Sequence, residues 1–578
     1  MRGAGDSGRR PGICYREEYI TRVTTSLSSP TRQSSIAMDV VRNSDYLGPV
    51  AAGLSLAVIA RLAYMQLLPK PDPHLPHNPV TNLLGDVPEL FRFIDGGKKN
   101  FADFIDSMCA KHGPIYQLMF VRSQLVVIAD RTEYERLLLR SKSVEQSRFT
   151  NAIFGTVIPT GQISLPTDEV WKRHRQLTGP SMSRRYLEHM SVRILTAANN
   201  LVRLWTRKVE LVGNKAFDAH SDTRTAISDA ILSIAIGDSP SFIDMIYTSL
   251  AVSSPITSDE GLAQFSHSEL PPLQKSSRKM METIESMQLS PFPVTIARLF
   301  AWMPPSRRRS YRVISGFLGE KIAEARAREA EFSTKQGETL ATDADCVVDM
   351  IIQREAREGA EKFDDGELLD ELMTYVLAGQ DTTAATLSWL LKYLPLDAGI
   401  QQRLHDEVCA AFGSDQNGPM DFNTLSDSQK LPVLEAVVTE TLRCAMTGPI
   451  TGRELIADEV VLGRNLPKGT EILFPIAYMG LQESDWGSDA KVWRPSRWLR
   501  DDGSFDSSAG PSYPFGLGQR GCFGQRLAVL QLKVFAATLS RAFVFKPLPL
   551  NLGNWDSVLK VNRAPKSCYV SLEEWPTN

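Results

Sequence analysis

The sequence predicts a mainly α-helical protein with small β-sheets, built as one large domain behind a membrane anchor. Long apolar stretches with helical character, Glu367–Leu394 and Leu527–Leu539, stand in the second half, and short strand signals occur at Ile115–Met119 and Gln124–Ala129. The 578 residues are 43% hydrophobic with a net charge of -3, which allows a large core and argues against a disordered or nucleic-acid-binding protein. We find no internal repeat and no convincing linker after about residue 80.

The N-terminal region predicts an anchor followed by a spacer. Residues 1–45 form an extension that we expect to be disordered. Residues 46–68 are mostly apolar and uncharged apart from Arg61, and they are long enough to cross a bilayer if that side chain reaches the interface; a cleavable signal peptide and a buried core helix are the alternatives. Prolines make residues 69–79 a semi-rigid spacer, and residues 80–578 form the globular body.

The charges around the apolar span bear on where the protein starts. Counted from Met1, seven arginines precede the span, and the positive-inside rule would keep the N-terminus in the cytosol. Counted from Met38, only Arg42 remains, and two aspartates balance it. We therefore expect Met38 to be the working start and the body to face the cytosol. Two adjacent acids near residue 17 weaken the alternative of a mitochondrial presequence.

The cysteines give two separate indications. The seven cysteines show no C-x-x-C spacing, which favours a reducing compartment without a disulfide framework or zinc ribbon. Cys522 stands apart from the others, because it precedes a predicted helix, neighbours Arg520, and lies in a stretch without Asp or Glu from Ser507 to Trp555. Holding a thiolate at pH 7 costs about 2 kcal/mol and a helix terminus supplies about 0.3–1 kcal/mol, whereas a coordinated metal deprotonates the thiol outright. Cys522 is therefore a candidate metal ligand, although a lone cysteine is more often a small buried apolar residue.

The same segment contains the spacing G-x-G-x-x-G, at Gly516, Gly518 and Gly521. A dinucleotide-binding fingerprint would follow a strand and would be followed, about 20 residues later, by an acid for the ribose. Residues 511–514 read as a turn and no such acid follows. We therefore reject the nucleotide-binding interpretation.

A longer pattern in this segment, F-x-x-G-x-R-x-C-x-G, is filled by Phe515, Gly518, Arg520, Cys522 and Gly524. It resembles the haem-binding loop of the cytochrome P450 superfamily of haem-thiolate monooxygenases, and the loop sequences look closest to fungal microsomal members. The resemblance extends over residues 80–578 and implies the cytochrome P450 fold. It also implies haem b (iron protoporphyrin IX) as cofactor, with the Cys522 thiolate as axial ligand and the other four residues in contact with the haem.

The predicted helix Glu367–Leu394 is interrupted by polar residues at 378–383, Ala-Gly-Gln-Asp-Thr-Thr. Glycine and residues that compete for backbone hydrogen bonds are unfavourable in a buried helix. Their presence in a helix that is otherwise strongly predicted indicates a functional role. Gly379 would leave room for a ligand. The segment resembles the oxygen-activation groove of the same family, which makes Asp381 and Thr382 the candidate catalytic residues for proton delivery; a helix bent by satisfied Ser and Thr side chains is the alternative.

Further residues are candidates for holding the cofactor's carboxylates. Trp171 and Arg175 stand four apart and share one helix face. Alone, this spacing is usually packing plus a solvated arginine. The resemblance assigns the pair, and more loosely Arg453, to the haem propionates together with Arg520.

A basic stretch is a candidate docking surface for an acidic electron donor. Lys172, Arg173 and His174 lie between the residues of the Trp-Arg pair, and Arg526 and Lys533 could extend the surface. An ordinary solvated helix face is the alternative.

Glu440 and Arg443 form E-x-x-R after an apolar run, which predicts a buried ion pair in need of further partners. The resemblance adds Arg497 as the third member of a structural cluster beneath the haem.

Elsewhere we expect strands at Leu455–Leu462 and Glu471–Phe474 around a turn. We also expect a surface loop at residues 333–344, and an apolar stretch at residues 242–252 that lines a substrate entrance, touches the membrane or belongs to the core.

The resemblance implies a monooxygenase that inserts one atom of O2 into a lipophilic substrate. We expect a tailoring oxidation of a terpenoid or polyketide in secondary-metabolite biosynthesis, with a fatty-acid or xenobiotic hydroxylase as the alternative. A haem-thiolate isomerase or dehydratase and a non-enzymatic haem sensor are the competing classes. Because the chain has no convincing flavin or nicotinamide site, we expect electrons from a separate NADPH–cytochrome P450 reductase, with cytochrome b5 as a second partner. The expected location is the endoplasmic reticulum membrane, with a single span and a cytosolic body.

Overall fold

The computed structural model describes residues 33–94, 99–238, 240–250, 256–257, 261–265, 270–288, 298–299, 304–333, 344–357, 361–416 and 418–576. The chain divides into two compact units, Met1–Leu68 and Pro69–Asn578. We refer to the second unit as the body.

The first unit contains a single described helix, α1 (Gln33–Leu67). It starts ahead of the predicted anchor, so residues 33–45 are helical, whereas we expected the whole extension to be disordered. Residues 1–32 lie outside the described residues, and the assignment of Met38 as the start stays a prediction. Val50–Leu67 has a mean hydropathy of 1.6 and exposed side chains, so this helix is long and apolar enough to cross a membrane.

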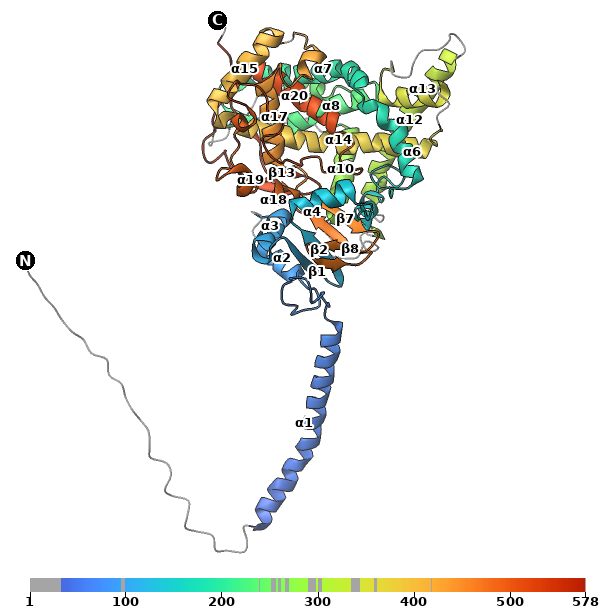
Figure 1. Ribbon diagram of the computed structural model, residues 1–578, viewed down its shortest axis with the longest axis vertical. Coiled ribbons are helices and arrows are strands. Elements are labelled where there is room, and N and C mark those ends of the chain that lie inside the picture. The colour runs from blue at the N-terminus through green and yellow to red at the C-terminus, as the bar shows by residue number, and fades with distance from the viewer. Residues whose placement is uncertain are drawn as a thin grey trace, which may run out of the picture. The chain divides into compact units, whose positions relative to one another are not determined.

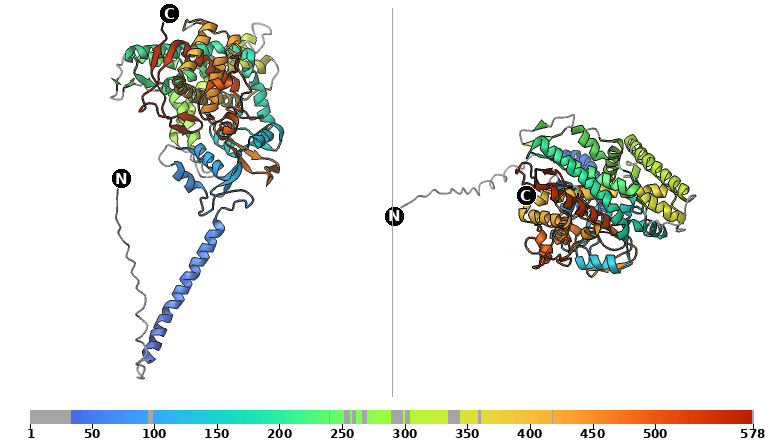
Figure 2. Two further views of the ribbon diagram at one scale, coloured as in Figure 1. Left: turned by 60° about the vertical axis from the view of Figure 1, so that its left-hand side comes forward. Right: turned by 90° about the horizontal axis from the view of Figure 1, so that it is seen from above.

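Helices make up most of the body (Figures 1 and 2), as predicted. The two helices expected from the sequence are present as α14 (Asp365–Tyr393) and α20 (Gln525–Ala542). A reciprocal capping box between Asp364 and Glu367 fixes the start of α14. The other main helices are α2 (Val87–Ile94), α3 (Phe101–His112), α4 (Arg131–Glu135), α5 (Arg148–Phe154), α6 (Glu169–Thr178), α7 (Arg184–Val212), α8 (His220–Ile236), α9 (Phe242–Leu250), α10 (Pro272–Gln288), α12 (Pro305–Ser333), α13 (Val347–Arg357), α15 (Ala398–Phe412), α16 (Phe422–Leu425), α17 (Pro432–Ala445), α18 (Ile476–Gly480) and α19 (Glu483–Trp486).

A five-stranded sheet with the order β1-β2-β10-β7-β3 lies at one end of the body (Figure 1). Its first two strands, β1 (Ile115–Phe120) and β2 (Ser123–Ile128), confirm the predicted strand pair. β10 (Glu471–Phe474) runs parallel to β2 and antiparallel to β7 (Thr451–Leu455), and β3 (Val144–Gln146) pairs with β7 at the edge. The smaller sheets are β14-β4-β6-β5 (Tyr569–Val570, Ala216–Asp218, Leu262–Gln264, Ile256–Thr257), β11-β15 (Phe543–Phe545, Leu572–Glu574), β12-β13 (Ser557–Leu559, Arg563–Pro565) and β8-β9 (Glu459–Val461, Arg464–Leu466).

The predicted strand Leu455–Leu462 is wrong. β7 ends at Leu455, and the chain then forms a separate hairpin of β8 and β9. Leu462 and Gly463 both have positive φ, 47° and 74°, which suits the two central residues of a tight hairpin turn. The apolar run therefore covers a strand end and a hairpin arm rather than one strand.

The largest apolar cluster of the body joins α7, α8, α14, α17 and α20, and a second cluster lies against the five-stranded sheet. Helix α9 packs on α7 and α8 and contributes Phe242, Ile243 and Leu250 to the large cluster. Of the three roles considered for residues 242–252, the core therefore holds for the part through Leu250. Residues 251–252, and residues 334–343 of the expected surface loop, lie outside the described residues.

Candidate active site

The loop before α20 folds back on itself around Cys522. The Cys522 N–H donates to the Phe515 carbonyl over 2.8 Å, and the Gly521 N–H donates to the Gly518 carbonyl over 2.9 Å. Gly518 has φ 74°, and a Cβ at this position would come within 2.3 Å of the Leu138 carbonyl oxygen. Only glycine allows this close approach, so Gly518 shapes the loop.

Cys522 combines two properties that rarely occur together. Its side chain is exposed, yet the surrounding protein desolvates the thiol and raises its pKa, while a hydrogen bond from the Gly524 N–H acts in the opposite direction. The Cys522 sulfur is therefore open to a ligand although the surrounding protein desolvates it. Among the residues described, no three His, Cys, Asp or Glu side chains gather to hold a metal, so a metal bound at Cys522 would need its other ligands from a cofactor.

Three arginines lie close enough together to repel one another. Burial lowers the pKa of Arg520 to about 10, with Glu145 acting against the shift and the charges of Arg453 and Arg175 adding to it. Burial also lowers the pKa of Arg453 and of Arg175. Glu145 lies 3.5 Å from Arg520, and the charge of Glu371 acts on Arg175, so two carboxylates stand against three guanidiniums that are buried or half-buried. This group of arginines, which we call the arginine triad, fits an anionic cofactor with two carboxylates.

Trp171 supports the triad through its ring. The guanidinium carbon of Arg520 lies 4.5 Å from the centre of the Trp171 ring, and that of Arg175 lies 5.5 Å from it. Arg175 also lies 4.6 Å from the ring of Phe523, next to Cys522. Cation–π contacts of this kind orient an arginine without neutralising its charge. Arg520 also donates to the Thr167 hydroxyl over 2.7 Å and to the carbonyls of Gln162 and Leu165, so neutral acceptors hold it and its charge remains.

The polar segment of α14 has one feature that differs from expectation. A Cβ at Gly379 would come within 2.8 Å of Ile231 Cδ1 on α8, so this glycine allows α14 and α8 to pack closely rather than leaving room for a ligand. The Thr382 hydroxyl donates to the Ala378 carbonyl over 2.8 Å. One turn further, the Thr386 hydroxyl donates to the Thr382 carbonyl and contacts the Thr447 hydroxyl at 2.8 Å.

Asp381 forms an ion pair that the sequence did not indicate. Arg224 on α8 approaches the carboxylate with Nε 2.7 Å from Oδ1 and Nη2 3.0 Å from Oδ2. Burial raises the pKa of Asp381, and the charge of Arg224 works against that rise. The Arg224 side chain is 26% exposed, so the pair connects the buried carboxylate to the solvent side of α8.

Comparison with known proteins identifies the family. The model of the cytochrome P450 family matches residues 81–556. The chain belongs to the cytochrome P450 family. Among its relatives are the cytochrome P450 monooxygenases GME11363 of Pestalotiopsis microspora (28% identity over 91% of this chain and 98% of the relative), TRI13 of Fusarium sporotrichioides (28%, 90% and 98%) and xilC of Penicillium crustosum (26%, 88% and 93%).

Family membership confirms the predicted class of protein. The chain is a cytochrome P450 monooxygenase, an oxidoreductase that uses O2, an organic substrate and a redox partner. Cytochrome P450 enzymes carry haem ligated by a cysteine thiolate. The environment of Cys522 and the arginine triad fit that cofactor.

The predicted structural cluster of this cytochrome P450 is fully assembled. Glu440 accepts two hydrogen bonds from Arg443, at 2.7 and 2.8 Å, and one from Arg497 at 2.9 Å. The indole N–H of Trp498 donates to Glu440 over 2.8 Å as well. Arg443 and Arg497 extend the cluster to the backbone carbonyls of the preceding loop, at Ala490 and Val492. Because all of these partners converge on one carboxylate, Glu440 holds α17 and the loop in one arrangement.

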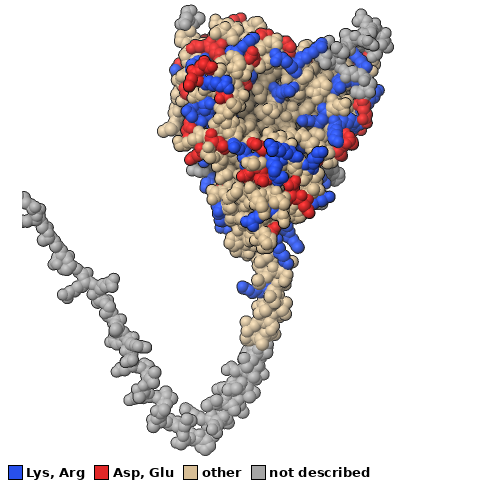
Figure 3. Space-filling model, in the orientation of Figure 1, with Lys and Arg blue, Asp and Glu red and all other residues tan. Residues whose placement is uncertain are grey.

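The predicted docking surface of this cytochrome P450 is wrong. His174 is completely buried, since it lies on the face of α6 that contacts α14. Arg173 forms ion pairs with Glu361 and Glu367, and Lys533 is buried and paired with Glu435. Lys and Arg residues alternate with Asp and Glu on the face of the body in Figure 3. The basic stretch in the sequence therefore does not form one exposed basic patch.

A cavity of about 2070 Å³ lies among α2, α5, the five-stranded sheet and residues 557–561. Much of its wall is apolar, from Phe91, Ile153, Leu299, Ile450, Leu473 and Val561. Arg453 of the triad belongs to the wall, whereas Cys522, Asp381 and Thr382 are not among its described lining residues. The cavity thus reaches Arg453 of the arginine triad.

Three residues that support the site were missed in the sequence analysis. Arg224 pairs with Asp381, and the Gln162 side chain accepts from Arg175 while its backbone accepts from Arg520. Glu371 accepts from Gln162 in turn. Glu371 could have been recognised from the sequence, because a carboxylate in the apolar part of a long helix needs polar partners. Gln162 in a loop and Arg224 on another helix have no such distinguishing context.

Proposed function

We propose that this cytochrome P450 oxidises a lipophilic secondary metabolite, a terpenoid or a polyketide, with Cys522 as the haem ligand. The observation that carries the assignment of the site is the exposed but desolvated thiol of Cys522, which feels the charge of Arg175, together with the neighbouring guanidiniums of Arg453 and Arg520. When bound, the haem supplies the activation of O2, and a thiolate ligand pushes electron density toward cleavage of the O–O bond.

The chain's own residues have distinct parts in this mechanism. The Gly524 N–H stabilises negative charge on the Cys522 sulfur, and Arg175, Arg453 and Arg520 hold the two cofactor carboxylates. Phe515, Gly518 and Gly524 shape the loop that presents the sulfur. Asp381, whose pKa burial raises, holds a proton more readily than an exposed aspartate and passes it inward when it separates from Arg224. The Thr382 hydroxyl, on the next position of α14, accepts and donates that proton.

Two observations support the substrate class. The cavity wall is largely apolar, which suits a lipophilic molecule. A fungal relative, the Hps1-dma1 cluster cytochrome P450 monooxygenase cyp3.1 of Dothistroma septosporum, is 31% identical over 45% of this chain and 96% of that protein, and its name, which refers to a cluster, favours a tailoring step in a pathway. A fatty-acid or xenobiotic hydroxylase is the alternative, and a haem-thiolate isomerase or dehydratase would need no redox partner.

The first unit supports a membrane location. We propose that the apolar helix containing Val50–Leu67 anchors the body to the endoplasmic reticulum, with the body in the cytosol. Residues 69–79, expected as a spacer, belong to the body instead, where Leu75 is buried and the Asp72 carbonyl accepts from Gln117 over 2.6 Å. A separate NADPH–cytochrome P450 reductase in that membrane would supply electrons, with cytochrome b5 as a second donor.

The proposal is tested by titrating the full-length protein in detergent with terpenoids, polyketides, fatty acids and sterols while following the haem absorption band. A shift with terpenoids or polyketides, followed by turnover that needs NADPH, reductase and O2, is the expected result. A shift with fatty acids alone would support the alternative substrate class. Turnover of a peroxide without O2 or reductase would replace the monooxygenase mechanism by an isomerase or dehydratase.

Replacing Thr382 by alanine is expected to leave haem bound and to uncouple the reaction, because the hydroxyl that passes the proton is lost. NADPH consumption should continue while product falls and hydrogen peroxide rises, and assays of all three in parallel measure the effect. Thr386→Ala is the matched control, since Thr386 makes the same type of bond to the helix backbone one turn further on. Unchanged coupling in Thr382→Ala would contradict the role.

A further inference from the structure

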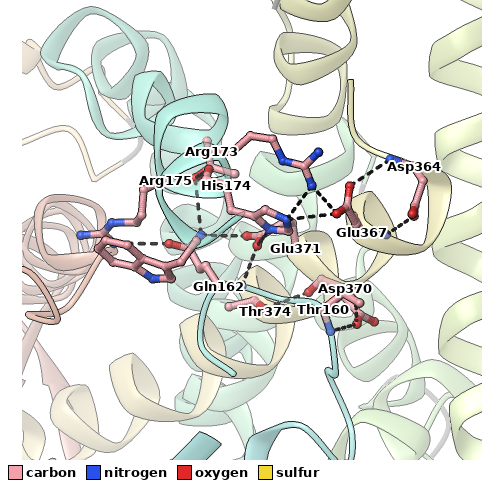
Figure 4. Close-up of polar contacts among 12 residues, drawn as sticks. Thr160, Gln162, Arg173, His174, Arg175, Asp364, Glu367, Asp370, Glu371 and Thr374 are labelled. Carbon is pink, nitrogen blue, oxygen red and sulfur yellow. Dashed lines mark hydrogen bonds and ion pairs between the residues drawn. The ribbon is translucent and has the colours of Figure 1, made fainter. Parts of the chain in front are cut away.

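A network of buried polar groups joins α6 to the first turns of α14 (Figure 4). His174 and Glu371 are both completely buried, and His174 Nδ1 lies 2.7 Å from Glu371 Oε1. On its other side, His174 Nε2 lies 3.5 Å from Glu367 Oε1, and the ring packs edge-on against Phe363 at 4.7 Å. Glu371 is thereby held by a donor on α6 and cannot turn toward solvent.

Gln162 occupies the space between Glu371 and the arginine triad. Its backbone N–H donates to Glu371 Oε1 and its side-chain amide Nε2 donates to Oε2, each over 2.7 Å. Its side-chain oxygen faces the other way and accepts from Arg175 Nη1 at 3.3 Å. Its backbone carbonyl accepts from Arg520 Nη1 at 3.1 Å. One residue therefore contacts two of the three arginines, and Figure 4 shows it between Glu371 and Arg175.

The chemistry of Glu371 decides which way the Gln162 amide points. An ionised carboxylate only accepts hydrogen bonds, whereas an amide has one accepting and one donating end. Glu371 requires the NH2 group of Gln162, and this leaves the amide oxygen for Arg175. If residue 371 offered a donor instead, Gln162 would turn its oxygen toward residue 371, and its NH2 group would then face the guanidinium of Arg175, donor against donor.

The charge of Glu371 also reaches Arg175 directly. Burial lowers the pKa of Arg175, and the charges of Cys522, Tyr375 and Glu371 act against this shift. Glu371 therefore contributes to the triad both through the orientation of Gln162 and through its field.

We propose that Glu371, acting through Gln162, is a positioning residue that fixes Arg175 for the carboxylates of the haem. The inference rests on the proposed function, in which the triad binds those carboxylates. Neither Glu371 nor Gln162 touches the cofactor in this proposal. Their effect is on how firmly the haem is held.

The test compares Glu371→Gln with the wild-type full-length enzyme. The readout is the rate at which haem transfers from the protein to an excess of apomyoglobin. We expect transfer to be about tenfold faster in the variant, the size associated with one lost hydrogen bond to a charged group. The carbonyl difference spectrum of the haem, recorded before transfer, should still report thiolate ligation.

Asp370→Asn is the matched control. Asp370 precedes Glu371 on α14 and holds the same loop, through the N–H and hydroxyl of Thr160 at 2.8 and 2.7 Å, but no described bond leads from it to the triad. Its replacement should leave the rate of haem transfer at the wild-type value. Equal acceleration in both variants would overturn the proposal, because loosening of the loop would then explain the effect.

A double variant separates the route through Gln162 from general damage. Gln162→Leu removes the acceptor for Arg175, so adding Glu371→Gln to Gln162→Leu should increase haem transfer by much less than tenfold. Fully additive effects would show that Glu371 acts by another route and would overturn the proposal. A wild-type protein without a thiolate-haem spectrum would refute the proposed function instead.

Discussion

Replacing Cys522 by alanine is expected to abolish turnover and the thiolate-haem spectrum. Among the cysteines that the structure describes, Cys522 is the one with an exposed side chain, and the protein nevertheless desolvates its thiol. Alanine has no atom that can coordinate iron. The measurement is the carbonyl difference spectrum of the purified variant together with NADPH-dependent product formation. Haem held by the arginine triad alone would bind weakly and show a spectrum without thiolate character.

Cys568→Ala is the control for this prediction. Cys568 is also a free cysteine, but it is buried in the core, where burial raises the pKa of its thiol to about 12, and its sulfur donates to the Ser388 carbonyl at 3.4 Å. Its replacement should leave spectrum and turnover intact. Loss of the thiolate spectrum in Cys568→Ala with retention in Cys522→Ala would contradict the assignment.

The second large effect is expected for Glu440→Gln, which should lower the free energy of unfolding by about 3–5 kcal/mol. The carboxylate receives Arg443, Arg497 and Trp498 in the interior. A glutamine would leave the buried Arg443 without its paired carboxylate and Arg497 with Asp489 alone, and it would turn an N–H toward one of the donors. Thermal or denaturant unfolding of the haem-bound protein, followed by far-ultraviolet circular dichroism, measures the loss.

Asp489→Asn serves as the comparison, because Asp489 also pairs with Arg497, at 3.4 Å, but from an exposed position. Only a small effect is expected there. A cost for Asp489→Asn as large as that for Glu440→Gln would contradict the importance of burial.

The stabilisation by Glu440 should also depend on pH in a defined sense. Burial acts to raise the pKa of Glu440, but the hydrogen bonds and charge of Arg443 outweigh it, and the pKa is lowered. A carboxyl whose pKa is lower in the folded state stabilises fully above its ordinary pKa of about 4.3 and loses this contribution as the pH falls through the lowered value. The difference between wild type and Glu440→Gln should therefore be constant near neutral pH and shrink below about pH 4.

The sequence predicted the parts of the site that lie within single elements. Cys522 with its glycines, the polar segment of α14, and Glu440 with Arg443 each sit inside a continuous motif, so their spacing alone reveals them. The two helices α14 and α20 and the strands β1 and β2 were likewise predicted from local apolar patterns. Such local patterns predict helices and strands correctly because each element buries its own apolar face in the folded protein.

The sequence could not predict contacts that the fold brings together from distant segments. Glu371 and Gln162 are 209 residues apart, and Arg224 and Asp381 are 157 apart. The predicted docking surface around His174 was wrong for a related reason, because adjacent residues on a helix point to different faces. His174 is buried against α14, and its neighbour Arg173 is paired with Glu367. Charge in the sequence does not distinguish a solvated face from an interior ion pair.

In the proposed function, the arginine triad would couple the amount of folded protein to the supply of its cofactor. Repulsion among the three guanidiniums would penalise the folded chain until an anion arrives, and a ligand that binds only the folded state adds about 1.4 kcal/mol of stability for every tenfold excess over its dissociation constant. Chains made while haem is scarce would unfold more often and be degraded sooner. The abundance of this enzyme in a cell would then follow haem synthesis as well as transcription of its gene.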